Sequence, residues 1–249
     1  MDADTGIGGP QNRFPETRRS AIIDLRSPDT RSREYALETL IAAYWKPVYK
    51  YIRVRWNQSN ENAKDLTQTF FARALEKEFF HGYDPAKARF RTYLRVCLDG
   101  FLANENKAAS RIKRGGDADV VSLHFDDAEE EFRLREIAST EATPEEYFHR
   151  EWVRNLFTLA TEDVKRECKE RDQRIQYDVF ERYDLNDSAG RPSYNALAAE
   201  LGITAAAVTN YLAAMRRRFR DRILTRIRET TGSEQEFRDE VRAALGVEV

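Results

Sequence analysis

The amino-acid sequence predicts an all-α fold in which two helical domains are joined by an acidic linker. Apolar residues recur at spacings of three and four along most of the chain, as they do on the buried face of an amphipathic helix. Glycine and proline, which break helices, number only 11 and 7 among 249 residues. Charged residues make up 34% of the chain, which is typical of helices with wide solvated faces.

The first predicted domain covers residues 18–116. It follows an N-terminal segment, residues 1–17, that is expected to be disordered because it lacks periodicity. Pro47 is expected to begin a new helix, since the missing N–H of proline has no cost there. Asp84 is expected to cap the last helix of the domain, with Pro85 in its first turn. One helix is expected to begin at Ser32 and a second at Pro47. Two more are expected at about residues 61–76 and 85–113.

The second predicted domain covers residues 144–231 and follows the acidic linker, residues 117–143. Residues 117–146 hold eleven acidic and two basic side chains and little periodicity, which favours a mobile linker. Residues 232–249 are a C-terminal extension that is expected to form one short amphipathic helix. The helices of this half are expected at about residues 145–168, 173–183, 193–201, 205–228 and 234–245.

Residues 194–208 have the spacing of a helix-turn-helix. Leu197 and Leu201 would point into a small core. Gly202 can take the left-handed conformation that a tight turn needs, and Thr204 is placed to cap the second helix. The second helix of such a motif fits the major groove of DNA, with its first residues nearest the base edges. An ordinary helical hairpin is the alternative.

The outer face of this second helix holds side chains suited to DNA. Thr209 and Asn210 can hydrogen-bond base edges, whereas Ala205 and Ala206 can contact thymine methyl groups. Basic side chains farther along the helix are expected to contact phosphate, which adds affinity but no sequence information. These residues are Arg216, Arg217, Arg218 and Arg220.

The charge distribution also favours a polyanionic partner. Residues 87–114 carry a net charge of +6 and residues 216–228 again +6, while the acidic residues 117–146 between them carry −9. Two basic blocks separated by an acidic one suit a protein that touches a polyanion at two places. Solvated helix faces are the alternative.

Three stretches together resemble one protein family. Residues 65–74 read D-L-T-Q-T-F-F-A-R-A and are similar to the polymerase-binding helix of bacterial RNA polymerase sigma factors. Residues 90–94, with the basic helix down to Arg114, resemble the segment that melts and reads the −10 element. Residues 194–219 resemble the domain that reads the −35 element. The resemblance covers residues 33–114 and 150–228, and is to the sigma-70 family in its compact extracytoplasmic-function (ECF) form.

The resemblance implies roles for individual residues. Core RNA polymerase would be bound by Asp65, Leu66, Gln68, Thr69 and Arg73. The −10 DNA would be bound by Phe79, Phe80, Tyr83, Arg91, Tyr93, Arg95, Asn104, Asn106, Lys107, Arg111, Lys113 and Arg114. The −35 DNA would be bound by Thr204, Ala205, Ala206, Thr209, Asn210, Arg216, Arg217, Arg218 and Arg220. For Phe79 and Phe80, the alternative is that they close the core of the first domain.

The sequence departs from the family at the polymerase-binding helix. Lys64 and Thr69 stand where the family often has acidic residues. Phosphorylation of Thr67 or Thr69 would add about −1.5 to −2 of charge there and could switch polymerase binding on. The recognition helix also departs, because the family often has basic or polar residues where Thr209, Asn210 and Tyr211 stand. The −35 sequence is therefore expected to be unusual.

Other classes of protein fit the sequence less well. His81, His124 and His149 lie far apart, and neither a phosphate-binding loop nor a nucleophile motif is present, so we expect no enzymatic activity, cofactor or metal. No apolar run is long enough to span a membrane, so a cytoplasmic protein is expected. The partners expected are core RNA polymerase and promoter DNA. Control by an anti-sigma factor or a Ser/Thr kinase stays open, as does a helix-turn-helix regulator that does not bind polymerase.

Overall fold

The computed structural model describes residues 20–76, 79–109, 123, 125, 128, 142–186 and 191–247. These residues form helices and no strand, which confirms the predicted all-α class. The elements are α1 (Ala21–Asp24), α2 (Thr30–Arg55), α3 (Asn60–Glu76), the 3-10 helix η1 (Phe79–Gly82), α4 (Phe90–Ala109), α6 (Pro144–Glu170), α7 (Arg174–Phe180), the π-helix η3 (Glu181–Leu185), α8 (Tyr194–Leu201), α9 (Ala205–Glu229) and α10 (Glu234–Leu245).

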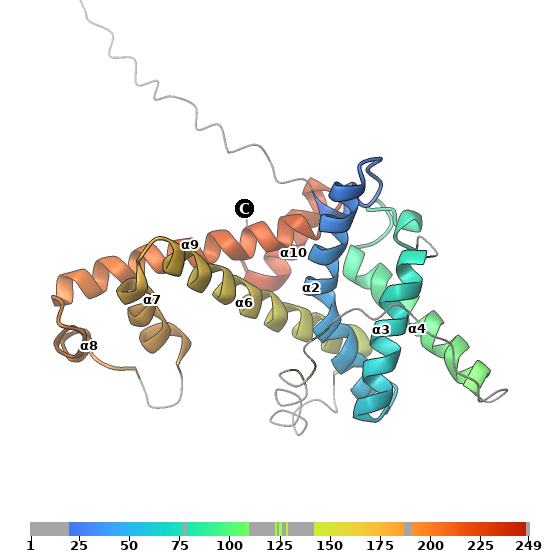
Figure 1. Ribbon diagram of the computed structural model, residues 1–249, viewed down its shortest axis with the longest axis horizontal. Coiled ribbons are helices and arrows are strands. Elements are labelled where there is room, and N and C mark those ends of the chain that lie inside the picture. The colour runs from blue at the N-terminus through green and yellow to red at the C-terminus, as the bar shows by residue number, and fades with distance from the viewer. Residues whose placement is uncertain are drawn as a thin grey trace, which may run out of the picture.

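The molecule consists of a helical head, an arm and a tip (Figure 1). The head contains α1 to α4 and α10. The arm is formed by α6 and α9, which run side by side and join the head at one end. The tip, at the other end of the arm, contains α7, η3, α8 and the start of α9. The predicted helix-turn-helix therefore lies far from the predicted polymerase-binding helix.

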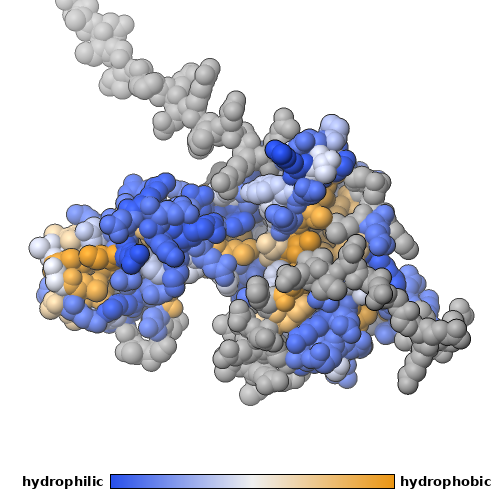
Figure 2. All heavy atoms as spheres, viewed as in Figure 1, coloured by the Kyte–Doolittle hydropathy of each residue, from blue (hydrophilic) through white to orange (hydrophobic). Residues whose placement is uncertain are grey.

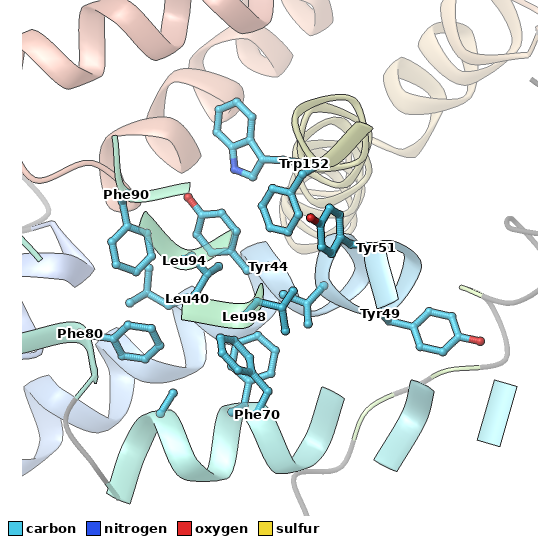
Figure 3. Close-up of a cluster of buried hydrophobic side chains, with 14 of the residues drawn as sticks. Leu40, Tyr44, Tyr49, Tyr51, Phe70, Phe80, Phe90, Leu94, Leu98 and Trp152 are labelled. Carbon is cyan, nitrogen blue, oxygen red and sulfur yellow. The ribbon is translucent and has the colours of Figure 1, made fainter. Parts of the chain in front are cut away.

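The main hydrophobic core lies in the head and crosses the predicted domain boundary. Leu40 and Phe70 come from the first predicted domain, whereas Trp152, Ile227 and Val241 come from residues after the acidic segment. All five side chains are buried in one cluster. Figure 3 shows Trp152 above the side chains that α2, α3 and α4 contribute to this cluster. The two halves of the chain are therefore packed together in the head.

A few residues of the acidic segment are described, and they are anchored. The Phe125 side chain is 7% exposed, and its ring centroid lies 5.4 Å from that of Trp45 and 5.3 Å from that of Tyr49. Ala128 is fully buried in the same core. The sequence predicted a mobile linker here. At these positions that prediction is wrong, because burial of an aromatic ring outweighs the ordering cost of the residue that carries it.

The prediction that Pro47 begins a new helix is also wrong, because α2 continues through it. A proline inside a helix leaves the carbonyl four residues earlier without its N–H partner. That carbonyl belongs to Ala43, and it accepts a hydrogen bond at 2.9 Å from the side-chain amide of Asn155 on α6. The same amide donates to the Ala42 carbonyl at 2.9 Å. A side chain more than a hundred residues away thus makes the proline tolerable.

A buried ion pair lies in the same contact between α2 and α6. Lys50 Nζ lies 3.1 Å from the carboxylate of Glu151, and both side chains are buried.

The start of α6 is defined locally, because Thr143 and Glu146 form a capping box around Pro144. This start agrees with the predicted one.

The last helix of the first predicted domain begins later than the sequence indicated. Asp84 accepts a hydrogen bond from the Ala86 N–H at 3.0 Å and stabilises a turn, and α4 begins only at Phe90. The Phe90 N–H donates to the carboxylate of Glu236 on α10 at 2.6 Å. The acceptor for the first N–H group of α4 is therefore a carboxylate near the other end of the chain. The predicted end of this helix, at about residue 113, lies outside the described residues.

Candidate nucleic-acid interface

The tip has helix-turn-helix geometry. After α8 ends at Leu201, Gly202 takes a left-handed φ of +65°. Thr204 accepts a hydrogen bond from the Ala207 N–H at 3.1 Å and caps α9. The axes of α8 and α9 are bent by 101° at this break, which falls within the range of about 90–120° for helix-turn-helix motifs. Glycine and the capping threonine thus produce the turn at the predicted place.

A small core holds the two helices of the motif together. Leu197 and Ala198 of α8 are buried against Val208 and Leu212 of α9, and Val179 of α7 completes the cluster. Figure 2 shows apolar residues gathered at this tip, whereas the visible surface of the arm is mostly hydrophilic. Because the inner face of α9 is used for packing, its outer face lies at the surface.

The outer face of α9 begins with the residues predicted to contact base edges. Ala206, Thr209 and Asn210 are exposed, and Ala205 is half-buried. The Thr209 hydroxyl donates to the Ala205 carbonyl at 3.1 Å, so part of its hydrogen-bonding capacity is used within the helix. Of the two polar side chains predicted to bond base edges, Asn210 is therefore the more available one.

The four arginines predicted to contact phosphate divide into two pairs. Arg216 makes two hydrogen bonds, of 2.8 and 2.9 Å, to the carboxylate of Asp184. Arg218 donates to the side-chain oxygen of Gln173 at 2.9 Å and is half-buried. Arg217 and Arg220 are exposed on the outer part of α9. Arg217 and Arg220 therefore present their charge to the surroundings, whereas the first two help to hold α9 on α7 and η3.

The predicted polymerase-binding face lies on α3. Asp65 is exposed, and Gln68 and Thr69, three and four residues later, are half-buried on the same face. Thr67 points the other way, because its side chain is fully buried and its hydroxyl donates to the Ala63 carbonyl at 2.7 Å. A phosphate on Thr67 would have to enter the core, which leaves Thr69 as the accessible one of the two threonines.

The other two residues of the predicted polymerase site take part in the fold. Leu66 is half-buried and packs against the main core. Arg73 forms an ion pair with Glu105 of α4, and its guanidinium lies 5.4 Å from the centroid of the Phe101 ring. Both therefore fix α3 against the rest of the head.

The aromatic residues of the loop before α4 that were predicted to bind −10 DNA are largely buried. Phe80 is 6% exposed and Tyr83 is 2% exposed, and their ring centroids lie 5.7 and 5.1 Å from that of Phe90. Figure 3 shows Phe80 and Phe90 both pointing into the core cluster. Phe79 is half-buried, and its carbonyl accepts a hydrogen bond from the Tyr93 hydroxyl at 2.5 Å. Phe80 therefore matches the alternative given from the sequence: its ring packs into the core of the head.

Arg91, predicted to contact −10 DNA, is buried beneath α10. Its Nε donates to both carboxylate oxygens of Glu240, at 2.9 and 3.0 Å, and its guanidinium lies 5.5 Å from the centroid of the Trp152 ring. Burial raises the pKa of Glu240, and the charge of Arg91 opposes that rise. In this conformation α10 covers the Arg91 side chain, so the guanidinium is not accessible to a ligand from solution.

The remaining predicted −10 residues lie along α4. Arg95 forms an ion pair with Asp99 at 2.9 Å and is half-buried. Asn104, Asn106 and Lys107 are exposed near the end of the helix. Arg111, Lys113 and Arg114 lie outside the described residues. The exposed part of this surface is therefore the second half of α4.

Sequence reasoning missed the two carboxylates that cover part of the predicted −10 surface, Glu236 and Glu240. Both are buried, and they alternate with Phe237 and Val241 on one face of α10. Their spacing of four residues, on the apolar face of an amphipathic helix, was visible in the sequence. Acidic side chains are almost never fully buried unless they are paired, so two acids on such a face indicate partners elsewhere in the fold.

Comparisons with protein-family models, with curated proteins and with solved structures returned no match for this chain. In the part of the chain that the structure describes, no group of three or more His, Cys, Asp or Glu side chains is arranged to hold a metal ion. No single helix there is both long and apolar enough to cross a membrane.

Proposed function

We propose that this chain is a transcription initiation factor of the sigma type, which acts by binding and not by catalysis. It binds bacterial core RNA polymerase through α3, contacts the −10 region through α4 and places its helix-turn-helix on −35 DNA. The observation that supports this proposal most directly is the helix-turn-helix, with its 101° bend and its exposed outer face on α9. Such a motif presents its second helix to the major groove.

The polymerase contact is supported by the chemistry of α3. An exposed carboxylate, Asp65, lies beside the polar side chains of Gln68 and Thr69 on a helix whose opposite face is packed into the head. Such a face suits a basic helical surface on a partner, because complementary charges favour the encounter and fix its orientation.

The arm supports the use of two DNA contacts by one molecule. Arg226 on α9 makes two hydrogen bonds of 2.8 Å to Asp163 on α6, and Arg222 pairs with Glu167 at 2.5 Å. These partly buried pairs hold α6 and α9 side by side along the arm. The arm thereby separates the tip from the head, which suits a protein that contacts two separate promoter elements.

Binding of the purified chain to core RNA polymerase tests the proposal, with the double variant Asp65→Ala/Gln68→Ala beside it. We expect tight binding that weakens at least about tenfold in the variant, as when interface contacts are truncated. Glu38→Ala is the matched control, because it removes a carboxylate from α2 and not from α3. Equal polymerase affinity for all three proteins would refute the assignment of α3.

Selection from a library of duplex DNA tests the tip. Asn210→Ala should change the preferred base at one or two positions, because it removes a group that can bond a base edge. Arg220→Ala should weaken binding to all sequences and reduce the salt dependence by about one ion, as expected for a phosphate contact. An unchanged base preference in Asn210→Ala would count against the predicted docking of α9.

Thr69 is the residue at which phosphorylation could strengthen polymerase binding. Thr69→Glu should raise the affinity, since it supplies negative charge beside Asp65. Thr67→Glu should instead unfold the head, because the new carboxylate would replace a side chain that is fully buried. Equal polymerase affinity of Thr69→Glu and the unmodified chain would exclude this form of control.

The second candidate function is a helix-turn-helix regulator that does not bind polymerase. One observation favours it: the outer face of α9 is exposed, whereas Tyr83 and Arg91 on the predicted −10 surface are buried. Duplex DNA binding that depends on Asn210, without any binding to core polymerase, would support this candidate over the first.

A further inference from the structure

The C-terminal helix α10 buries two acidic side chains against the head. Glu236 is 4% exposed and Glu240 is 2% exposed, and both lie on the face of α10 that packs onto the start of α4. A buried carboxylate is costly unless donors surround it. The donors that these two acids use show which surface α10 covers.

Glu236 is held by three donors that converge on its carboxylate. One oxygen accepts from the Phe90 N–H at 2.6 Å, where α4 begins. The other accepts from the Tyr83 hydroxyl at 2.8 Å and from the Gly232 N–H at 2.6 Å. Two of the three donors therefore belong to the segment that the proposed function assigns to −10 DNA.

Glu240 completes the contact one turn later. It accepts two hydrogen bonds from Arg91, and the Nε of Arg89 lies 3.9 Å from the same carboxylate. Arg91 is 7% exposed, and Glu240 is the carboxylate with which it pairs, at 2.9 Å. The side chain that was predicted to bind −10 DNA instead pairs with a protein carboxylate.

The covered groups are those with which proteins bind phosphate. A main-chain N–H at the start of a helix, a tyrosine hydroxyl and an arginine guanidinium are common donors to phosphate oxygens. A glutamate carboxylate presents the same negative charge and acceptor oxygens at hydrogen-bond distance. Glu236 and Glu240 therefore use donors of the kind that bind the phosphates of a nucleic-acid strand.

We propose that α10 is an intramolecular competitor of single-stranded promoter DNA for the surface formed by Tyr83, Phe90 and Arg91. This inference rests on the proposed function, because it concerns the same −10 surface. DNA and α10 exclude each other there, so the strand binds only those molecules in which α10 has left. The apparent DNA affinity falls by the fraction of molecules in that open state, and bound DNA weakens the docking of α10 by the same factor.

Binding of a fluorescein-labelled single-stranded DNA of mixed sequence, followed by anisotropy, tests the competition on the full chain. Glu240→Gln keeps the shape of the side chain and removes the charge that compensates Arg91. It should raise the affinity for the strand roughly tenfold to a hundredfold, the effect of losing one charge-assisted hydrogen bond. Asp239→Asn is the matched control: it removes one charge from the same helix, at a carboxylate that accepts a hydrogen bond from Gln235 of α10. It should change the affinity less than about twofold.

Amide hydrogen exchange supplies a second measurement that needs no substitution. Saturating single-stranded DNA should speed exchange across α10 in the unmodified chain and slow it at the start of α4. Slower exchange at both places, or no change in either, would overturn the proposal. An equal affinity for the strand in Glu240→Gln and Asp239→Asn would do the same.

These outcomes separate the competition from the proposed function itself. The proposed polymerase contact uses Asp65 and Gln68 of α3, which α10 does not supply. A chain that binds polymerase but shows no competition loses only this inference. A chain that shows the competition without binding polymerase loses only the initiation-factor proposal.

Discussion

Replacing Asn155 by leucine should destabilise the docking of α6 on α2 through one defined cause. The Asn155 side chain is 4% exposed and donates to the carbonyls of Ala42 and Ala43. Residue 47 is proline, so the Ala43 carbonyl has no N–H partner within α2. Leucine is close to asparagine in shape but cannot donate, and the buried carbonyl would lose the amide that satisfies it.

The magnitude follows from the two hydrogen bonds. Leaving a buried acceptor unsatisfied costs about 1–3 kcal/mol, and the Ala42 carbonyl loses a further bond of about 1 kcal/mol. We therefore expect the free energy of unfolding to fall by about 2–4 kcal/mol. Urea denaturation followed by circular dichroism measures this change. Asn104→Leu, at an exposed site on α4, is the control and should change stability by less than about 0.5 kcal/mol.

A double-mutant cycle tests the mechanism. Pro47→Ala restores an N–H that can bond the Ala43 carbonyl, so it should recover about 1–2 kcal/mol of the loss in the Asn155→Leu background. In the unmodified background the same N–H competes with the Asn155 amide and should add less. If Asn155→Leu costs the same in the unmodified chain as in the Pro47→Ala variant, our explanation of the unbroken helix is refuted.

Two further predictions concern the head. Phe125→Ala should lower the free energy of unfolding by about 3–5 kcal/mol, because it removes a ring packed on Trp45 and Tyr49; a loss below about 1 kcal/mol would show that this residue is not anchored. Burial, followed by the charge of Arg91, lowers the pKa of His149 from 6.5 to about 4. The unfolded chain therefore binds the proton more readily, and stability should fall as the pH drops from about 6.5 toward 4. His149→Phe, which keeps a ring against Trp152, should reduce that slope, and an identical pH dependence in urea denaturation would contradict it.

Local sequence was sufficient where one segment contains all the groups that define a structure. Gly202 and Thr204 determine the turn and the cap of the helix-turn-helix within a few residues of chain. Thr143 and Glu146 define the start of α6 in the same way. Side chains three and four residues apart meet in any helix, so these features do not depend on the rest of the fold.

Local sequence was insufficient where the deciding partner lies far along the chain. Pro47 is expected to interrupt a helix until Asn155 is known to satisfy the freed carbonyl. Arg91 belongs to a basic block that suggests an open DNA surface, but Glu240 covers it from 149 residues away. The sequence shows which residues are basic or aromatic. It does not show whether a distant element of the fold covers them.

The sequence by itself determined the helical class, the position of the helix-turn-helix and the amphipathic C-terminal helix, because periodicity and capping act over single turns. Only the tertiary structure decided that the residues before and after the acidic segment share one core, and that α10 covers the start of α4. Both depend on burying apolar surface and pairing charges between distant segments. The free energy of such contacts depends on which elements pack together, so it cannot be read from one stretch of sequence.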